Sequence, residues 1–97
     1  MTAFLEEFKQ AADGQRHDVV MNLVRKILED ILGAQKLTAL TPEAELKSLG
    51  VGSLQALEVR KRLGTELAST LPATLFMETP TLDSLVTYVE NRAKKSL

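Results

Sequence analysis

Few side chains in the sequence could perform catalysis, because the residue types that most often do so are scarce. Among 97 residues there is no cysteine and a single histidine, His17. A thiolate nucleophile and a cysteine- or histidine-rich metal site are therefore excluded, and we expect no metal site. Carboxylates pair only as surface neighbours, such as Glu29 with Asp30. Since catalysis needs a nucleophile with a base, or a cluster of acids and bases, we expect no enzymatic activity from this chain alone.

Ser53 has the most informative surroundings of any reactive side chain. It follows Gly50-Val51-Gly52 and stands where an amphipathic helix is predicted to begin. Glycines allow a sharp turn and a close approach by another molecule. A helix N-terminus offers free N–H donors and the positive end of the helix dipole, which favours a phosphate. A hydroxyl here suits a phosphodiester linkage, but an N-cap role for Ser53 would explain the same pattern, and the local pattern leaves both open.

Two stretches of the sequence resemble acyl carrier domains of modular type I polyketide synthases. The first, LGVGSLQALEVRKRL at 49–63, is similar to the family's attachment motif LGxDSL and the helix that follows it. The second, LPATLFMETPT at 71–81, is similar to the family's LPATLxFDxPT segment. The resemblance covers residues 16–93, with both motifs at the expected separation.

This resemblance implies a function for Ser53 and for its neighbours. Ser53 would carry a 4′-phosphopantetheine arm, transferred from coenzyme A by a phosphopantetheinyl transferase. The arm's thiol would hold polyketide intermediates as thioesters and present them to the ketosynthase, acyltransferase and processing domains of a synthase. Gly50, Val51, Gly52 and Leu54 would form the cofactor-binding surroundings.

The helix after Ser53 is, by the same resemblance, the surface that partner domains recognise. The residues expected to serve there are Gln55, Glu58, Arg60 and Arg62. We expect these contacts to be weak and transient, because a carrier that bound one partner tightly would stall. The isolated domain is expected to be a monomer.

Gly52 departs from the family pattern, which has an aspartate directly before the serine. In the family that acidic residue helps the transferase and its metal ion to engage the carrier. Two alternatives therefore stay open: a carrier-like interaction domain that is not loaded, and a peptidyl carrier domain of a nonribosomal peptide synthetase. The run 58–63 and the LPAT stretch favour the polyketide type over the peptidyl type.

The charge pattern excludes several other classes of protein. Twelve basic and thirteen acidic residues give a formal net charge of −1, unlike a nucleic-acid-binding domain. Arg60, Lys61 and Arg62 point about 100° apart on a helix and form no single patch. No apolar run approaches the ~18 residues of a membrane span, and no signal peptide is recognisable. We therefore expect a cytoplasmic protein that binds neither nucleic acid nor membrane.

Apolar periodicity predicts an all-α fold, a small four-helix bundle with a long connection between its first two main helices. The three main helices are predicted over 16–33, 53–68 and 82–94, and the short one over 73–77. Gly33 and Thr81 mark a helix end and a helix start respectively.

The chain ends are predicted to be separate from the carrier domain. Residues 1–15 are expected to contain a short helix over 3–12, which Gly14 would end. Two alternatives stay open for this segment: an N-terminal linker, or a helix that docks on the core. The carrier domain would span 16–94, followed by a tail at 95–97. His17 is expected to be exposed at a helix start, without a partner.

Individual positions carry further expectations about packing. In the 53–68 helix, Glu58 and Arg62 would pair on the exposed side, and Gly64 either permits close packing or is incidental. In the 34–52 connection, Thr41-Pro42-Glu43 would start a single turn of helix. The residues expected to face the core are Leu37, Leu40, Leu46 and Leu49 in that connection, Leu54, Ala56, Leu57, Val59, Leu63 and Leu67 in the helix, and Leu75, Phe76 and Met77 in the short helix.

Overall fold

The computed structural model describes residues 2–38 and 40–97, and within them the fold is built from helices. Three short 3-10 helices, η1 (Asp13–Gln15), η2 (Ala34–Leu37) and η3 (Leu46–Leu49), lie in the connections. In chain order the α-helices are α1 (Ala3–Gln10), α2 (Arg16–Leu32), α3 (Ser53–Leu67), α4 (Leu75–Glu78) and α5 (Leu82–Lys94). The predicted all-α bundle is confirmed.

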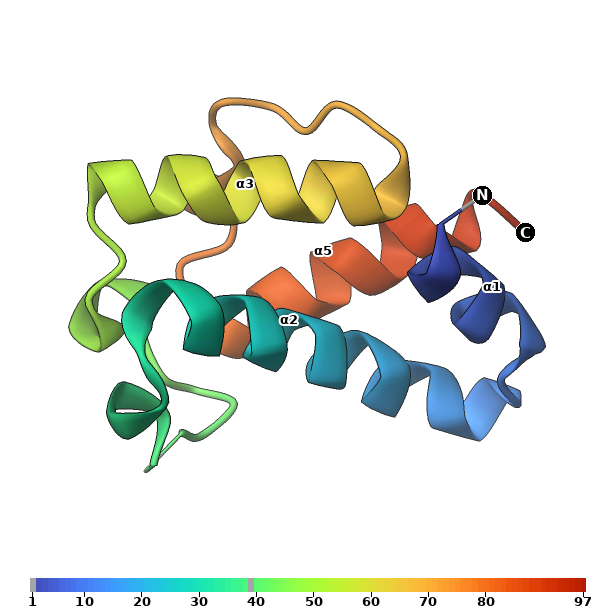
Figure 1. The fold of residues 1–97 in the computed structure, drawn as a ribbon, viewed down its shortest axis with the longest axis horizontal. Helices are drawn as coiled ribbons and strands as arrows, with labels where there is room; N and C mark the ends of the chain where they lie inside the picture. Colours follow the sequence, from blue (N-terminus) through green and yellow to red (C-terminus); the bar gives the residue numbers. More distant parts are fainter. Residues whose placement is uncertain (1, 39) are drawn as a thin grey trace.

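The three long helices form the bundle, and α2 packs against both α3 and α5 (Figure 1). Their apolar residues recur every three or four positions, which puts them on one face of each helix. These faces meet in one core, which is formed by Val20, Val24, Ile27 and Leu28 of α2, Val59, Leu63 and Leu67 of α3, and Leu82, Leu85, Val86 and Val89 of α5. None of the described helices is long and apolar enough to cross a membrane.

Local signals set the ends of α2 and α5 as the sequence predicts. Gly33 follows α2 with a φ of 92°, a conformation that favours glycine, and its N–H donates to the carbonyl of Glu29. Thr81 caps α5, since its hydroxyl accepts from the backbone N–H of Ser84 while the Ser84 hydroxyl is within hydrogen-bond distance of the Thr81 N–H. This reciprocal pair is a capping arrangement that satisfies two N–H groups at the helix start.

The N-terminal helix α1 packs on the end of the bundle. Phe4, Leu5 and Phe8 are buried in the common core. Arg16, at the start of α2, stacks over the Phe8 ring at 5.3 Å and its Nε donates to the Phe8 carbonyl at 3.1 Å. The expected role of Gly14 is wrong: α1 ends at Gln10, and Gly14 lies in η1 without a positive φ.

The long connection between α2 and α3 is ordered by its leucines and by backbone pairing. Leu37 and Leu46 are buried, and Leu40 and Leu49 pack at the core's edge, so this prediction is confirmed. Residues 41–44 form a single turn in which the Ala44 N–H bonds to the Thr41 carbonyl. Three backbone bonds join the connection to the start of α5: Leu46 N to Pro80 O at 2.9 Å, Leu82 N to Ala44 O at 2.9 Å and Asp83 N to Pro42 O at 2.8 Å.

The predicted apolar stripe of α3 is wrong at Leu54 and Leu57. Val59, Leu63 and Leu67 are buried, whereas Leu54 and Leu57 are 63% and 38% exposed. Leu57 precedes Val59 by two positions, or about 200° around a helix, so the two residues cannot share a buried face.

Met77 is also misplaced in the sequence prediction. In α4, Leu75 is buried and Phe76 packs at the core's edge, but Met77 is 83% exposed. The helix itself is four residues long and starts two residues later than predicted. A helix this short presents only one face to the core, and Leu75 takes that face.

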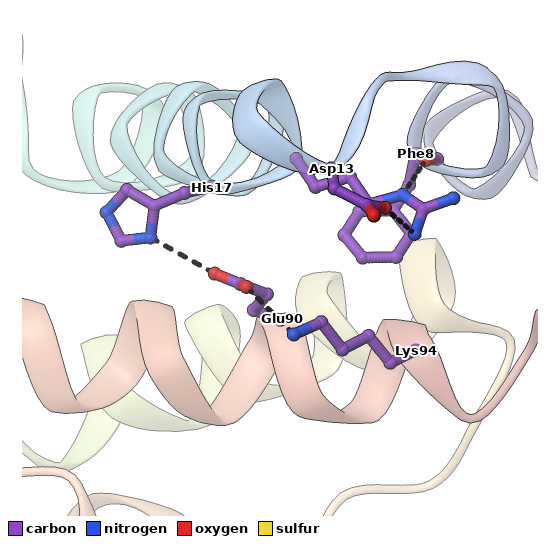
Figure 2. Close-up of polar contacts among 6 residues, drawn as sticks. Phe8, Asp13, His17, Glu90 and Lys94 are labelled. Carbon is purple, nitrogen blue, oxygen red and sulfur yellow. Dashed lines mark hydrogen bonds and ion pairs between the residues drawn. The ribbon is translucent and has the colours of Figure 1, made fainter.

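Two polar predictions are corrected by contacts between helices. Arg62 does not pair with Glu58 in the described part of the chain, and its Nη1 lies 2.9 Å from Asp30 Oδ2 on α2. His17 does have a partner, since its Nδ1 lies 3.1 Å from Glu90 Oε1 on α5. Figure 2 shows the Glu90 carboxylate between His17 and Lys94, whose Nζ lies 3.3 Å from Glu90 Oε2. Both corrections involve residues far apart in sequence.

Candidate functional site

Ser53 is the first residue of α3, and its hydroxyl has no structural role in the described part of the chain. The N-cap position is held by Gly52, so the interpretation of Ser53 as a capping residue is wrong. The side chain is exposed and has no hydrogen-bond partner among residues 2–38 and 40–97. Its oxygen is therefore open to the solvent.

The loop before Ser53 is held by one buried side chain and one left-handed glycine. Gly50 has a φ of 100°, a conformation that other residues rarely adopt. Val51 is buried, and its N–H donates to the carbonyl of Leu46 at 3.1 Å. Together these features anchor the loop, so the start of α3 has a defined position.

Gly52 is extended, with a φ of −86° and a ψ of −170°, which any residue can adopt. A Cβ at this position would lie 3.1 Å from Oε1 of Gln55, the end of a flexible side chain. An aspartate is therefore compatible with this backbone once Gln55 moves slightly. The difference from the family pattern is one of chemistry rather than of backbone shape.

A groove with a cavity volume of about 1230 Å³ opens beside Ser53. Its walls come from the loop before α3, from the first two turns of α3, and from α4 with its flanking residues. It brings Gly50, Val51, Gly52 and Ser53 together, as the sequence predicts, but Leu54 does not line it. The complete lining is Glu45, Leu46, Lys47, Gly50, Val51, Gly52, Ser53, Ala56, Leu57, Arg60, Ala73, Phe76, Met77 and Pro80.

The far wall of this groove was not assigned from the sequence. Phe76, Met77 and Pro80 belong to the second stretch that resembles the carrier family, and that resemblance alone could have indicated their place. Nothing local marks them as neighbours of Ser53, because more than twenty residues separate them in the chain.

The predicted recognition residues divide into two groups. Glu58 is exposed, and Gln55 is half-buried beside Gly52. The two arginines make intramolecular contacts: Arg62 pairs with Asp30, and Arg60 Nη1 donates to the carbonyl of Leu71 at 3.0 Å.

The groove combines apolar surface with groups that favour an anion near Ser53. The first bond of α3 runs from the Ala56 N–H to the Gly52 carbonyl, so the preceding amides of this turn have no acceptor within the helix. Lys47 and Arg60 line the groove together with Glu45, and Lys36 Nζ would lie 3.0 Å from a Cβ on Gly50. The free amides at the start of α3 are the groups that favour a phosphate at the Ser53 oxygen.

Comparison with known proteins identifies the family. The family described as "Phosphopantetheine attachment site" matches residues 22–89, which include Ser53 and the whole groove. Members of this family carry a covalently attached 4′-phosphopantetheine group.

Similar sequences occur within much longer synthases. The chain is 38% identical over 90 residues to spectinabilin polyketide synthase system protein NorB of Streptomyces orinoci, covering 93% of this chain and 4% of that protein. It is 33% identical over 88 residues to a phenolphthiocerol synthesis polyketide synthase type I of Mycobacterium marinum, with 91% and 4% covered. For polyketide synthase GfsB of Streptomyces halstedii the identity is 36% over 81 residues, with 84% and 2% covered. The chain therefore belongs to the phosphopantetheine attachment family, as an acyl carrier domain of the type I polyketide synthase kind.

Proposed function

We propose that this domain carries polyketide intermediates as thioesters on a 4′-phosphopantetheine arm attached to the hydroxyl oxygen of Ser53. The observation that carries the proposal is the position of that hydroxyl. It is exposed, it does not cap α3, and it stands at the edge of a groove whose lining contains no other serine among the described residues. The family match and the polyketide synthase relatives support the same assignment.

Attachment would be a phosphoryl transfer in which Ser53 is the acceptor. The Ser53 oxygen forms a bond to the phosphorus that bears pantetheine in coenzyme A, and the bond from that phosphorus to the bridging oxygen breaks. Adenosine 3′,5′-bisphosphate leaves, and the hydroxyl proton is taken up by a base of the transferase or by water. The amides at the start of α3 that have no acceptor within the helix would stabilise the new phosphodiester.

The domain itself would bind and present rather than catalyse. The thiol at the end of the arm supplies the thioester linkage, and the ketosynthase, acyltransferase and processing domains of a synthase supply the reactions. The groove walls formed by Val51, Leu57 and Phe76 are apolar and can shield part of an uncharged chain from water. As an isolated domain we expect a monomer.

Partner domains and the transferase would contact the exposed surface around the groove. Leu54, Leu57 and Met77 are large apolar side chains left exposed there. Exposed apolar residues that cluster beside a reactive group mark a surface for transient contacts. Glu58 adds an exposed charge on the same helix.

A carrier-like domain that is never loaded is the second candidate, and Gly52 is the residue that favours it. Without the usual aspartate, a transferase would lack one charge with which to engage the loop. The two candidates differ in whether Ser53 accepts the arm.

Incubation with coenzyme A and a promiscuous phosphopantetheinyl transferase distinguishes them by intact mass. The wild-type domain should gain one phosphopantetheine, and Ser53→Ala should gain none. Ser48→Ala is the matched control, because Ser48 is another exposed serine five residues earlier. Modification that persists in Ser53→Ala, or that fails in the wild type with several transferases, would count against the proposal.

A further inference from the structure

The groove beside Ser53 is lined by residues of two chain segments, 45–60 and 73–80, and Leu71 lies just before the second segment. Figure 1 shows the second segment, which turns back along α3 after that helix ends, before the chain enters α5. Two hydrogen bonds close the boundary. At one end the Leu46 N–H donates to the Pro80 carbonyl at 2.9 Å, and at the other Arg60 Nη1 donates to the Leu71 carbonyl at 3.0 Å. Of the two, only the Arg60 bond comes from a side chain.

Within the described residues, the segment between Ser69 and Leu75 has few other polar attachments. Ser69 is fixed to the bundle, because its N–H donates to the Gly64 carbonyl at 2.9 Å and its hydroxyl accepts from Arg92. Leu71 and Leu75 are buried, but the residues around them at 70 and 72–74 are exposed. Besides these two buried leucines, the Arg60 bond to the Leu71 carbonyl holds this exposed segment, so its loss should favour local opening.

Arg60 also contributes to a second hollow. It lines the groove at Ser53, and with Lys61 and Thr65 it lines a hollow of about 660 Å³. The half-buried Arg60 side chain therefore belongs to the walls of both spaces. This position differs from that of an exposed recognition residue, which would reach outward and leave the wall unaffected.

We propose that Arg60 is a positioning residue of the attachment site: by holding the Leu71 carbonyl it fixes the wall that carries Phe76 and Met77, and so sets the width of the groove beside Ser53. The importance of this width rests on the proposed function of Ser53 as the attachment point. The contact itself belongs to this chain and can be tested without any modification.

Hydrogen exchange on the unmodified domain tests the contact directly, with Arg60→Met against Lys61→Met. Methionine keeps most of the apolar stem of arginine, so the core should remain packed. Lys61 is the matched control, since it is exposed, adjacent and equally charged. The amides of Leu75, Met77 and Thr79 bond to carbonyls within residues 72–75 and report on the wall. They should exchange about tenfold faster in Arg60→Met, the order expected for a lost charge-assisted hydrogen bond, and stay unchanged in Lys61→Met.

The kinetics of phosphopantetheine transfer give the functional measurement. Arg60→Met should raise the KM of the transferase for the domain about three- to tenfold while kcat stays within twofold. The reason is that a smaller fraction of the molecules would have the groove wall in the conformation that the transferase binds. Lys61→Met should leave both near the wild-type values. A uniform loss of fold stability would instead lower the Tm and speed amide exchange throughout the helices, and not in the wall alone.

Two results would overturn the proposal. Exchange of the three amides that is unchanged in Arg60→Met would show that Arg60 does not hold the wall. Equal increases of KM in both variants would show that the transferase recognises the positive charge of α3. The contact of Arg60 with Leu71 would then not determine the KM. Failure of the wild-type domain to accept the arm would refute the proposed function, while the exchange result would still decide the role of Arg60.

Discussion

Gly64 of α3 lies directly against the backbone carbonyl of Ser69, so that a Cβ at Gly64 would come within 2.7 Å of that oxygen. The obstacle is backbone that is itself hydrogen-bonded to Gly64, so it cannot move aside easily. Of the two explanations that the sequence leaves open for this glycine, close packing is the one found.

Gly64→Ala should therefore destabilise the domain, although alanine is the better helix former. The gain in helix propensity is about 1 kcal/mol, whereas the steric conflict should cost about 1–3 kcal/mol beyond that gain. Gly14→Ala is the control, since nothing lies within 4 Å of its added Cβ and its φ is not positive. Urea unfolding measures both variants, and a Gly64→Ala domain as stable as the wild type would contradict this packing.

Phe8→Ala should destabilise the whole bundle, because we infer that α1 folds as part of the domain and not as a linker. Phe8 is fully buried, and removing such a ring typically costs about 3–5 kcal/mol. Lys9→Ala, at an exposed neighbouring position, should change stability by less than about 0.5 kcal/mol. Thermal unfolding followed by circular dichroism gives the comparison. Equal Tm values for the two variants would show that residues 1–15 are independent of the bundle.

Because of Glu90, the free energy of unfolding of the domain should decrease at acidic pH. Partial burial raises the pKa of its carboxyl, but hydrogen bonds from His17 and Lys94 and the charges of those residues outweigh this effect, and the pKa lies below its usual 4.5. A lowered pKa in the folded state gives stability that is present above about pH 4.5 and lost as the pH falls through the lowered pKa.

Glu90→Gln removes this dependence and provides the check. The urea midpoint of the wild type should exceed that of Glu90→Gln at pH 7, and the difference should shrink at pH 3.5. Asp83→Asn, an exposed acid at the start of the same helix, controls for a general loss of negative charge. A difference that stays constant between the two pH values would exclude the proposed linkage.

Gly52→Asp should increase the rate at which the domain accepts phosphopantetheine. The backbone at this position accommodates the side chain, whose oxygen can accept from the amide of Gln55 and cap α3. Gly52→Asn is the matched control, because asparagine supplies the same cap without the charge. Both variants should gain a few tenths of a kcal/mol in stability, whereas only Gly52→Asp should be modified faster. Equal rates for the two would show that the cap matters and the charge does not.

The bounds of α2 and α5 could be predicted because the residues that determine them lie close together in the sequence. The apolar period of α2, the glycine after it and the threonine before α5 each act within a few residues. The buried face of α3 was harder, since Leu54 and Leu57 continue an apolar pattern that the core does not use. Which of two apolar faces is buried depends on where α2 and α5 lie, and no local pattern carries that information.

The site could be predicted only in part for the same physical reason. The loop from Gly50 to Ser53 is contiguous, so its position next to the helix start follows from the sequence. The far wall depends on the contacts of Arg60 with Leu71 and of Leu46 with Pro80, which are formed only when distant segments pack. The role of Arg60 thus changes from a recognition residue expected by resemblance to a proposed positioning residue.

Mapping the modification on the natural protein tests the central claim most directly. The protein should be isolated from cells that are making polyketide, digested, and the peptide that contains Ser53 analysed by mass spectrometry. We predict a phosphopantetheine on Ser53, with a fraction of the arms carrying an acyl group that hydroxylamine releases as expected for a thioester. A Ser53 peptide that is wholly unmodified while the synthase makes its product would contradict the account.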